Sequence, residues 1–166
     1  MKFLASNKKT LFLGQSVKYP GSSIFQSLIN ISNNKKIEMP VFEDVQMGIS
    51  IGLALDGFIP ITCFPRFDFL VLAFNQLINH ADKLNQLTNN KFKSKIIVRT
   101  MVGSNKPLDA GCQHTQDHTE ALKKMLKYSK IIKLNNYRKI FNEYKNALKS
   151  KKYNVFVFVE DGNEYI

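Results

Sequence analysis

Short apolar runs alternate with amphipathic segments along this chain of 166 residues. The apolar runs are rich in Val, Ile, Leu and Phe and are bounded by glycine, proline or polar residues, a pattern that predicts strands buried on both faces. The predicted strands are residues 10–14, 37–42, 58–64, 95–99, 130–134 and 155–159. The predicted helices are residues 22–31, 68–84, 117–127 and 137–150, and residues 100–113 are predicted to form a loop.

Strands that are apolar on both faces and separated by helices predict a mainly parallel sheet covered by helices on each side. The predicted fold is therefore a three-layer α/β/α domain. The longest amphipathic helix is expected to begin with Asp68 as its N-cap. The length suits one compact domain, and since no linker or repeat interrupts the pattern, residues 1–166 are expected to form a single domain.

The pattern of residues 43–55 fits two structures. Apolar residues such as Met47, Ile49 and Ile51 alternate with smaller ones, which is the periodicity of a strand. Gly48 and Gly52 are spaced so that a helix could also pack closely against a neighbour. Propensity alone leaves this choice open.

Composition narrows the functional classes. The net charge of +11 suggests nucleic-acid binding. However, the lysines are spread along the chain among many asparagines, and the densest group falls on amphipathic segments, where charge usually marks the solvent-exposed side. An acidic partner protein is therefore favoured instead. Cys63 and Cys112 form no disulfide framework or metal-ligand spacing. No apolar run approaches the ~20 residues of a membrane span or the core of a secretory signal. A cytoplasmic protein is expected.

The segment Pro40–Ile61, which reads PVFEDVQMGISIGLALDGFIPI, carries a specific pattern. It resembles the segment with the cofactor-activating glutamate in the beta subunits of the first components of 2-oxo acid dehydrogenases. The positions in register are Glu43, Gly48, Gly52, Gly57 and Pro60. Similarity continues through residues 64–83, 97–99, 113–116 and the last strand, so it covers nearly the whole chain. The chain thus resembles the pyrimidine-binding domain of thiamine-diphosphate enzymes, in the transketolase-like superfamily.

The resemblance implies a helix for residues 43–55 and a set of site residues. Glu43 would be the catalytic carboxyl group that hydrogen-bonds to the aminopyrimidine ring of thiamine diphosphate and promotes its imino tautomer. Phe69 would stack on that ring, with Val41 and Pro65 lining the cofactor beside it. His114 would be the second catalytic residue and would face the substrate.

Two other histidines are weighed beside His114. His118 lies close by in the sequence and could share its role, because the register slips by about one residue after Gln116. His80 is expected to pack or cap on its own helix.

The resemblance also implies a partner. The family's diphosphate-binding motif, which holds Mg²⁺ and the phosphates, is not found in these residues, and neither is the family's C-terminal domain. An alpha-type subunit would therefore hold most of the thiamine diphosphate and the Mg²⁺, and two such pairs are expected to form a heterotetramer. The substrate would be a small 2-oxo acid or a ketose.

Several positions depart from the family pattern. Neutral Gln15 and Ser16 stand where the family often has an acidic pair that is thought to connect paired active sites, so that connection is not implied here. Val45 and Arg66 replace small or apolar residues, and Pro65 replaces a longer side chain, which implies a different pocket wall.

Four functions are weighed. The leading one is a subunit of a thiamine-diphosphate enzyme that decarboxylates a 2-oxo acid or transfers an acyl or aldehyde unit. The alternatives are a split transketolase-like two-carbon transferase and a non-catalytic domain that scaffolds or regulates a partner. A nucleic-acid binder is the last, since charge alone supports it.

Overall fold

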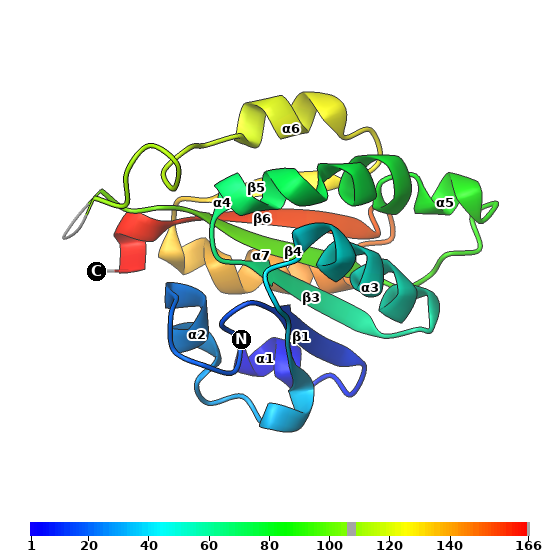
Figure 1. Ribbon diagram of the computed structural model, residues 1–166. Helices are drawn as coiled ribbons and strands as arrows, with labels where there is room; N and C mark the ends of the chain where they lie inside the picture. Colours follow the sequence, from blue (N-terminus) through cyan, green and yellow to red (C-terminus); the bar gives the residue numbers. More distant parts are fainter. Residues whose placement is uncertain (106–108, 166) are drawn as a thin grey trace.

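The computed structural model describes residues 1–105 and 109–165. Six parallel strands form one sheet in the order β2-β1-β3-β4-β6-β5 (Figure 1). The strands are β1 (Thr10–Gly14), β2 (Lys36–Glu38), β3 (Ile59–Phe64), β4 (Ile96–Val102), β5 (Lys130–Leu134) and β6 (Val155–Asp161). The prediction of a parallel sheet in an α/β/α domain is confirmed.

Helices cover both faces of the sheet. The α-helices are α1 (Lys2–Ala5), α2 (Ser23–Leu28), α3 (Glu43–Leu55), α4 (Phe67–Leu70), α5 (Leu84–Leu87), α6 (Thr119–Met125) and α7 (Tyr137–Lys149). Short 3₁₀ turns are η1 (Asn33–Lys35), η2 (Val71–Ala73) and η4 (Gly162–Tyr165), and η3 (Gln76–Ala81) is a π-helix. In the described part of the chain, no helix combines the length and hydropathy needed to cross a membrane.

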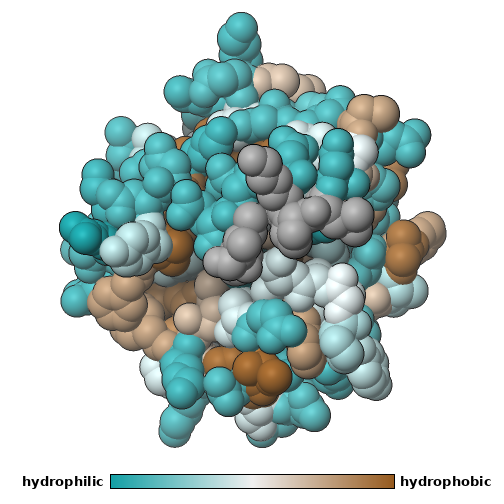
Figure 2. Space-filling model, turned by 90° about the vertical axis from the view of Figure 1, so that its left-hand side faces the viewer, coloured by the Kyte–Doolittle hydropathy of each residue, from teal (hydrophilic) through white to brown (hydrophobic). Residues whose placement is uncertain are grey.

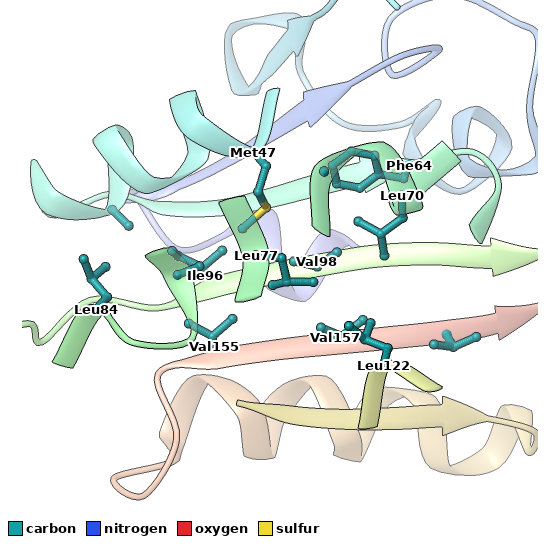
Figure 3. Packing of buried hydrophobic residues seen from close by; sticks show 14 of the residues in the cluster. Met47, Phe64, Leu70, Leu77, Leu84, Ile96, Val98, Leu122, Val155 and Val157 are labelled. Carbon is teal, nitrogen blue, oxygen red and sulfur yellow. The ribbon is translucent and has the colours of Figure 1, made fainter. Parts of the chain in front are cut away.

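The sheet separates two hydrophobic cores. On one face, side chains of α3, α4, η3 and α6, such as Met47, Leu77 and Leu122, pack on Ile96 and Val98 of β4 and their neighbours (Figure 3). The other core holds side chains of α1, α2 and α7 against alternate residues of the same strands, among them Ile97 and Phe158. Because successive strand residues point to opposite faces, both cores require strands that are apolar throughout.

The ambiguous segment 43–55 is a helix, and several predicted boundaries are wrong. β2 ends at Glu38 instead of running to residue 42, and Pro40, which has no N–H for a ladder, lies just beyond its end. β4 runs on to Val102, so residues 100–102 are strand and not loop. Of the predicted loop, residues 106–108 lie outside the described residues. α6 begins at Thr119, whose N–H donates to the Asp117 carboxylate at 3.0 Å.

The predicted helix from Asp68 is broken into α4, η2, η3 and α5. Asp68 is not its N-cap: α4 begins at Phe67, after an extended Arg66, and Asp68 lies inside the first turn. Apolar residues spaced three and four positions apart indicate which face of a helix is buried. A helix interrupted by 3₁₀ and π turns buries the same face, so the spacing does not reveal the interruptions.

Candidate functional site

The candidate site lies at the carboxyl edge of the sheet, where loops after parallel strands meet. Gln15 follows β1, Glu43 begins the helix after β2, Pro65 follows β3, and Gly103 follows β4. This edge is at the left of Figure 1 and faces the viewer in Figure 2. There, apolar side chains gather around a hollow in the lower half of the face, below a more hydrophilic upper half.

Glu43 is a buried acid at the first position of α3. Its relative exposure is 4%, and Gln15 Nε2 donates a hydrogen bond to its Oε1 at 2.9 Å. Among the described residues, no lysine, arginine or histidine forms an ion pair with it. The positive end of the helix dipole favours a carboxylate here. Glu43 is thus a buried carboxyl group with a neutral partner.

The loop after β1 places Gln15 beside Glu43. Gly14 has φ +146°, and a Cβ on it would collide with the backbone carbonyl of Cys63, so β1 passes β3 at a separation that only glycine allows. The next turn is held by Glu38, whose carboxylate accepts the backbone N–H groups of Ser16, Val17 and Lys18 at 2.6, 2.9 and 2.7 Å. The backbone that carries the side chain of Gln15 is therefore held in place.

The first turns of α3 are anchored to β3. Gln46, fully buried one turn after Glu43, donates from Nε2 to Thr62 Oγ1 at 2.9 Å and to the Cys63 carbonyl at 3.0 Å. The start of α3 is therefore linked to β3 by side-chain hydrogen bonds as well as by apolar packing. This attachment fixes the backbone from which Glu43 projects.

Phe69 and His114 lie together. Their ring centroids are 5.5 Å apart and their planes are nearly perpendicular, at 86°. The loop that carries His114 is tied to α4, because Gln116 Nε2 donates to Asp68 Oδ1 at 2.9 Å. Both rings are partly exposed at the carboxyl edge, where a ligand could reach them.

The other two histidines differ in environment. His118 packs edge-on against buried Phe67, with the two ring centroids 5.5 Å apart, so its ring lies at the edge of the hydrophobic core. His80 is exposed on η3.

The two remaining predicted cofactor-lining residues are unequal in burial. Pro65 is partly buried directly after β3, whereas Val41 is 75% exposed. Phe42, next to Val41, is 59% exposed. Two large apolar side chains are therefore exposed to water beside a buried acid.

Sequence reasoning missed the roles of Gln15 and Glu38. The sequence distinguishes Gln15 only by its lack of charge, and a contact across 28 residues leaves no local pattern. The available signal was Gly14 at the end of a buried strand, which marks a close approach followed by a sharp turn.

Metal and pocket features are sparse at this edge. In the described ranges, no three His, Cys, Asp or Glu side chains cluster as metal ligands would. Five hollows formed by the described residues have volumes of about 260 to 530 Å³, and none of these five is lined by Glu43, Phe69 or His114.

Comparisons with known proteins agree with the resemblance. The chain is 29% identical over 116 residues to the pyruvate dehydrogenase E1 component subunit beta of Gracilaria tenuistipitata var. liui, covering 68% of this chain and 35% of that protein. It is 30% identical over 114 residues to the subunit of the same name in Rickettsia conorii, covering 67% and 34%. The chain thus spans about a third of the length of these curated relatives. No protein-family model matches it.

A solved structure shares the fold. A split-gene transketolase, in an inactive beta4 tetramer, superposes with a TM-score of 0.58 at 16% identity, covering 96% of this chain and 48% of that one. Together, the relatives and the shared fold show that the chain is a homologue of the pyruvate dehydrogenase E1 beta subunits with a transketolase-like α/β fold.

Proposed function

We propose that this chain is the pyrimidine-binding subunit of a heteromeric thiamine-diphosphate enzyme that acts on a 2-oxo acid. The observation that carries the proposal is Glu43, a buried carboxyl group at a helix start whose hydrogen-bond partner is a neutral amide. The relatives' names supply the substrate class, since they are pyruvate dehydrogenase components.

The residues at this edge fit the cofactor. When bound, thiamine diphosphate supplies a carbon nucleophile that attacks the substrate carbonyl and holds the resulting negative charge. Glu43 would hydrogen-bond to the pyrimidine ring through Oε2, the oxygen that Gln15 does not engage. The Gln15 amide keeps the carboxyl group in place without neutralising it, so Glu43 can hold or release a proton at that ring.

Three further residues would form the wall of this site. Phe69 offers a partly exposed aromatic ring to the pyrimidine, while Val41 and Pro65 supply apolar contact beside it. His114, packed edge-on against Phe69, would face the substrate and exchange protons with it. The perpendicular packing of the two rings restricts the orientation of both side chains.

A partner chain would complete the site. The outer side of α3 bears Val45 and Ile49, which are 38% and 40% exposed, and a Cβ on Gly48 or Gly52 would meet nothing within 4 Å. Exposed apolar side chains beside a bare helix backbone allow another helix to approach closely. An alpha-type subunit packed there would bring the diphosphate and Mg²⁺ to Glu43, and two such pairs would form a heterotetramer.

The test is turnover and cofactor binding in the assembled complex. Thiamine diphosphate with Mg²⁺ is titrated calorimetrically into the chain alone and into its mixture with the co-purified partner, and binding is expected only in the mixture. Glu43→Ala should abolish pyruvate turnover while leaving assembly intact. Asp44→Asn, which removes an exposed acid from the same helical turn, is the matched control and should retain turnover. Unchanged turnover in Glu43→Ala would disprove the proposal.

The second candidate is a split transketolase-like transferase. It is favoured by the fold match, which covers 96% of this chain with a subunit of a split-gene transketolase. Turnover of a ketose phosphate in place of pyruvate would support this candidate. If no partner mixture binds thiamine diphosphate, the chain acts as a scaffold or regulatory domain.

A further inference from the structure

Arg66 joins β3 to α4 at the carboxyl edge of the sheet. Its backbone is extended, with φ −136° and ψ 147°, and it directly precedes the turn that carries Phe69. The side chain is partly buried, and Nη1 donates to the carbonyl of its own neighbour Pro65 at 3.0 Å. The guanidinium therefore stays at the strand end and does not extend into solvent.

Gly103 brings Arg66 next to the His114 loop. A Cβ on Gly103 would collide with the backbone carbonyl of His114 and would lie 3.4 Å from Arg66 Nε. Because Gly103 has no Cβ, the end of β4, Arg66 and the loop that carries His114 can lie close together. Arg66 thus lies beside the backbone of the His114 loop and directly before the turn that carries Phe69.

The charge of Arg66 is not balanced within the described residues. None of the ion pairs found there includes it. Asp68, the nearest acid in the sequence, accepts a hydrogen bond from Gln116. Arg99 shows the contrast, since its guanidinium makes two hydrogen bonds to the Glu160 carboxylate, of 2.5 and 2.8 Å. Partly burying a guanidinium without an anion costs free energy, which a bound anion would recover.

We infer that Arg66 binds the anionic group of the substrate, which in the proposed reaction is the carboxylate of the 2-oxo acid. The planar guanidinium carries N–H donors in a fork that matches two carboxylate oxygens. With the carboxylate on Arg66, the adjacent carbonyl group would lie on the His114 side of the site. This inference rests on the proposed function, and it assigns substrate recognition to a residue that departs from the family pattern.

Steady-state kinetics of the assembled complex test this role. Arg66→Gln should raise the KM for pyruvate about tenfold or more, as loss of a charged hydrogen bond does, with a much smaller change in kcat. Arg66→Lys should restore part of the affinity, because it keeps the charge without the fork. Arg138→Gln removes the same charge from an exposed position on α7 and should leave both parameters within about twofold of wild type.

The same KM comparison can be made with a ketose phosphate as the substrate. If that is the substrate turned over, the same rise in KM would show that Arg66 binds a phosphate group, which retains the anion role and supports the transketolase-like candidate. A KM within about twofold of wild type for the substrate in use would overturn the inference while leaving the proposed function standing.

Nuclear magnetic resonance of the chain alone tests the role of Arg66 separately from the proposed function. Pyruvate added to the isotopically labelled chain should shift the Arg66 Nε–H resonance in a saturable way, whereas the neutral amide of pyruvate should not. Arg66 responding equally to both probes, or to neither, would overturn the inference. This result does not depend on the cofactor, whereas failure of the wild-type mixture to bind thiamine diphosphate would refute only the proposed function.

Discussion

Gln15 Nε2 lies 2.9 Å from Glu43 Oε1 and connects the loop after β1 to the start of α3. The two residues are separated by 28 positions, and Glu38 holds the backbone between them by accepting three N–H groups. A neutral donor fixes the orientation of the buried carboxyl group and leaves its charge uncompensated. The position that the family often fills with an acid therefore serves here to support Glu43.

Gln15→Ala should weaken both stability and activity. Removing the amide leaves a buried carboxylate oxygen without its donor, which should lower the free energy of unfolding by about 1–3 kcal/mol. Urea denaturation of the free chain measures this loss, and turnover of the complex should fall because Glu43 gains other rotamers.

The control is Gln86→Ala, which truncates an exposed glutamine that donates to the Tyr128 hydroxyl. That change should cost less than about 0.5 kcal/mol. In a Glu43→Gln background, truncation of Gln15 should cost much less than in wild type, since the charged acceptor is gone. Equal costs in both backgrounds would show that the charge of Glu43 does not strengthen the 2.9 Å contact.

Two glycines should respond to alanine in opposite ways. Gly14→Ala places a Cβ against the Cys63 carbonyl at a φ of +146°, and should destabilise the chain by about 3 kcal/mol or more. Gly48→Ala meets open space on a helix and should stabilise the free chain by up to about 1 kcal/mol. Urea denaturation of the two variants checks both values.

Gly48→Ala should nevertheless weaken assembly with the partner, because the added methyl group stands on the proposed contact face of α3. Sedimentation analysis of the mixture measures this effect. A variant that is more stable alone and assembles as well as wild type would refute the use of this face.

The buried pair of Arg99 and Glu160 should be costly to break. Their side chains are 1% and 3% exposed, and Tyr144 and Ser27 add hydrogen bonds at 3.0 and 2.6 Å. Glu160→Gln keeps the shape but leaves the guanidinium without its counter-charge, so the free energy of unfolding should fall by about 3–5 kcal/mol.

Lys123→Ala provides the comparison, because it removes an ion pair with Glu120 that is 3.7 Å long and largely exposed. Its effect on stability should be below about 0.5 kcal/mol. A similar small loss for Glu160→Gln would mean that water reaches the Arg99 site.

The sheet could be predicted from the sequence because its central strands are apolar on both faces, as in the run Val155–Val159. Residues 43–55 could not be assigned from periodicity, since small residues on both the open and the buried side of α3 imitate a strand's alternation. Only the resemblance around Glu43 indicated a helix there. The resemblance also proposed Phe69 and His114, which the structure brings into contact.

The supporting residues of the site could not be predicted. Gln15, Glu38 and Arg66 make contacts set by tertiary structure, and apart from Gly14 beside Gln15 their local sequence gives no sign of these contacts. The same holds for the broken helix after Arg66, because the pattern of buried positions is unaffected by a change from α to 3₁₀ or π hydrogen bonding.

Cys63 and Cys112 should differ sharply in reactivity. Burial raises the pKa of the Cys63 thiol from its ordinary value of 9.0 to about 12, whereas Cys112 is exposed. Because the thiolate is the reactive form, iodoacetamide at pH 8 should modify Cys112 in the native chain and reach Cys63 only after unfolding. Mass spectrometry of the labelled peptides gives the two rates, and equal labelling in the native chain would contradict the burial of Cys63.

The same shift makes stability depend on alkaline pH. Between pH 9 and about 12 the thiol of Cys63 ionises in the unfolded chain but stays protonated in the folded one, so its contribution is complete below pH 9 and declines as the pH approaches 12. Cys63→Ala removes this group, and its free energy of unfolding should therefore fall less steeply than that of wild type over this range. Other groups that titrate there are common to both proteins, so the difference between the two denaturation series isolates Cys63. Parallel slopes would show that the thiol ionises as readily in the folded chain as in the unfolded one.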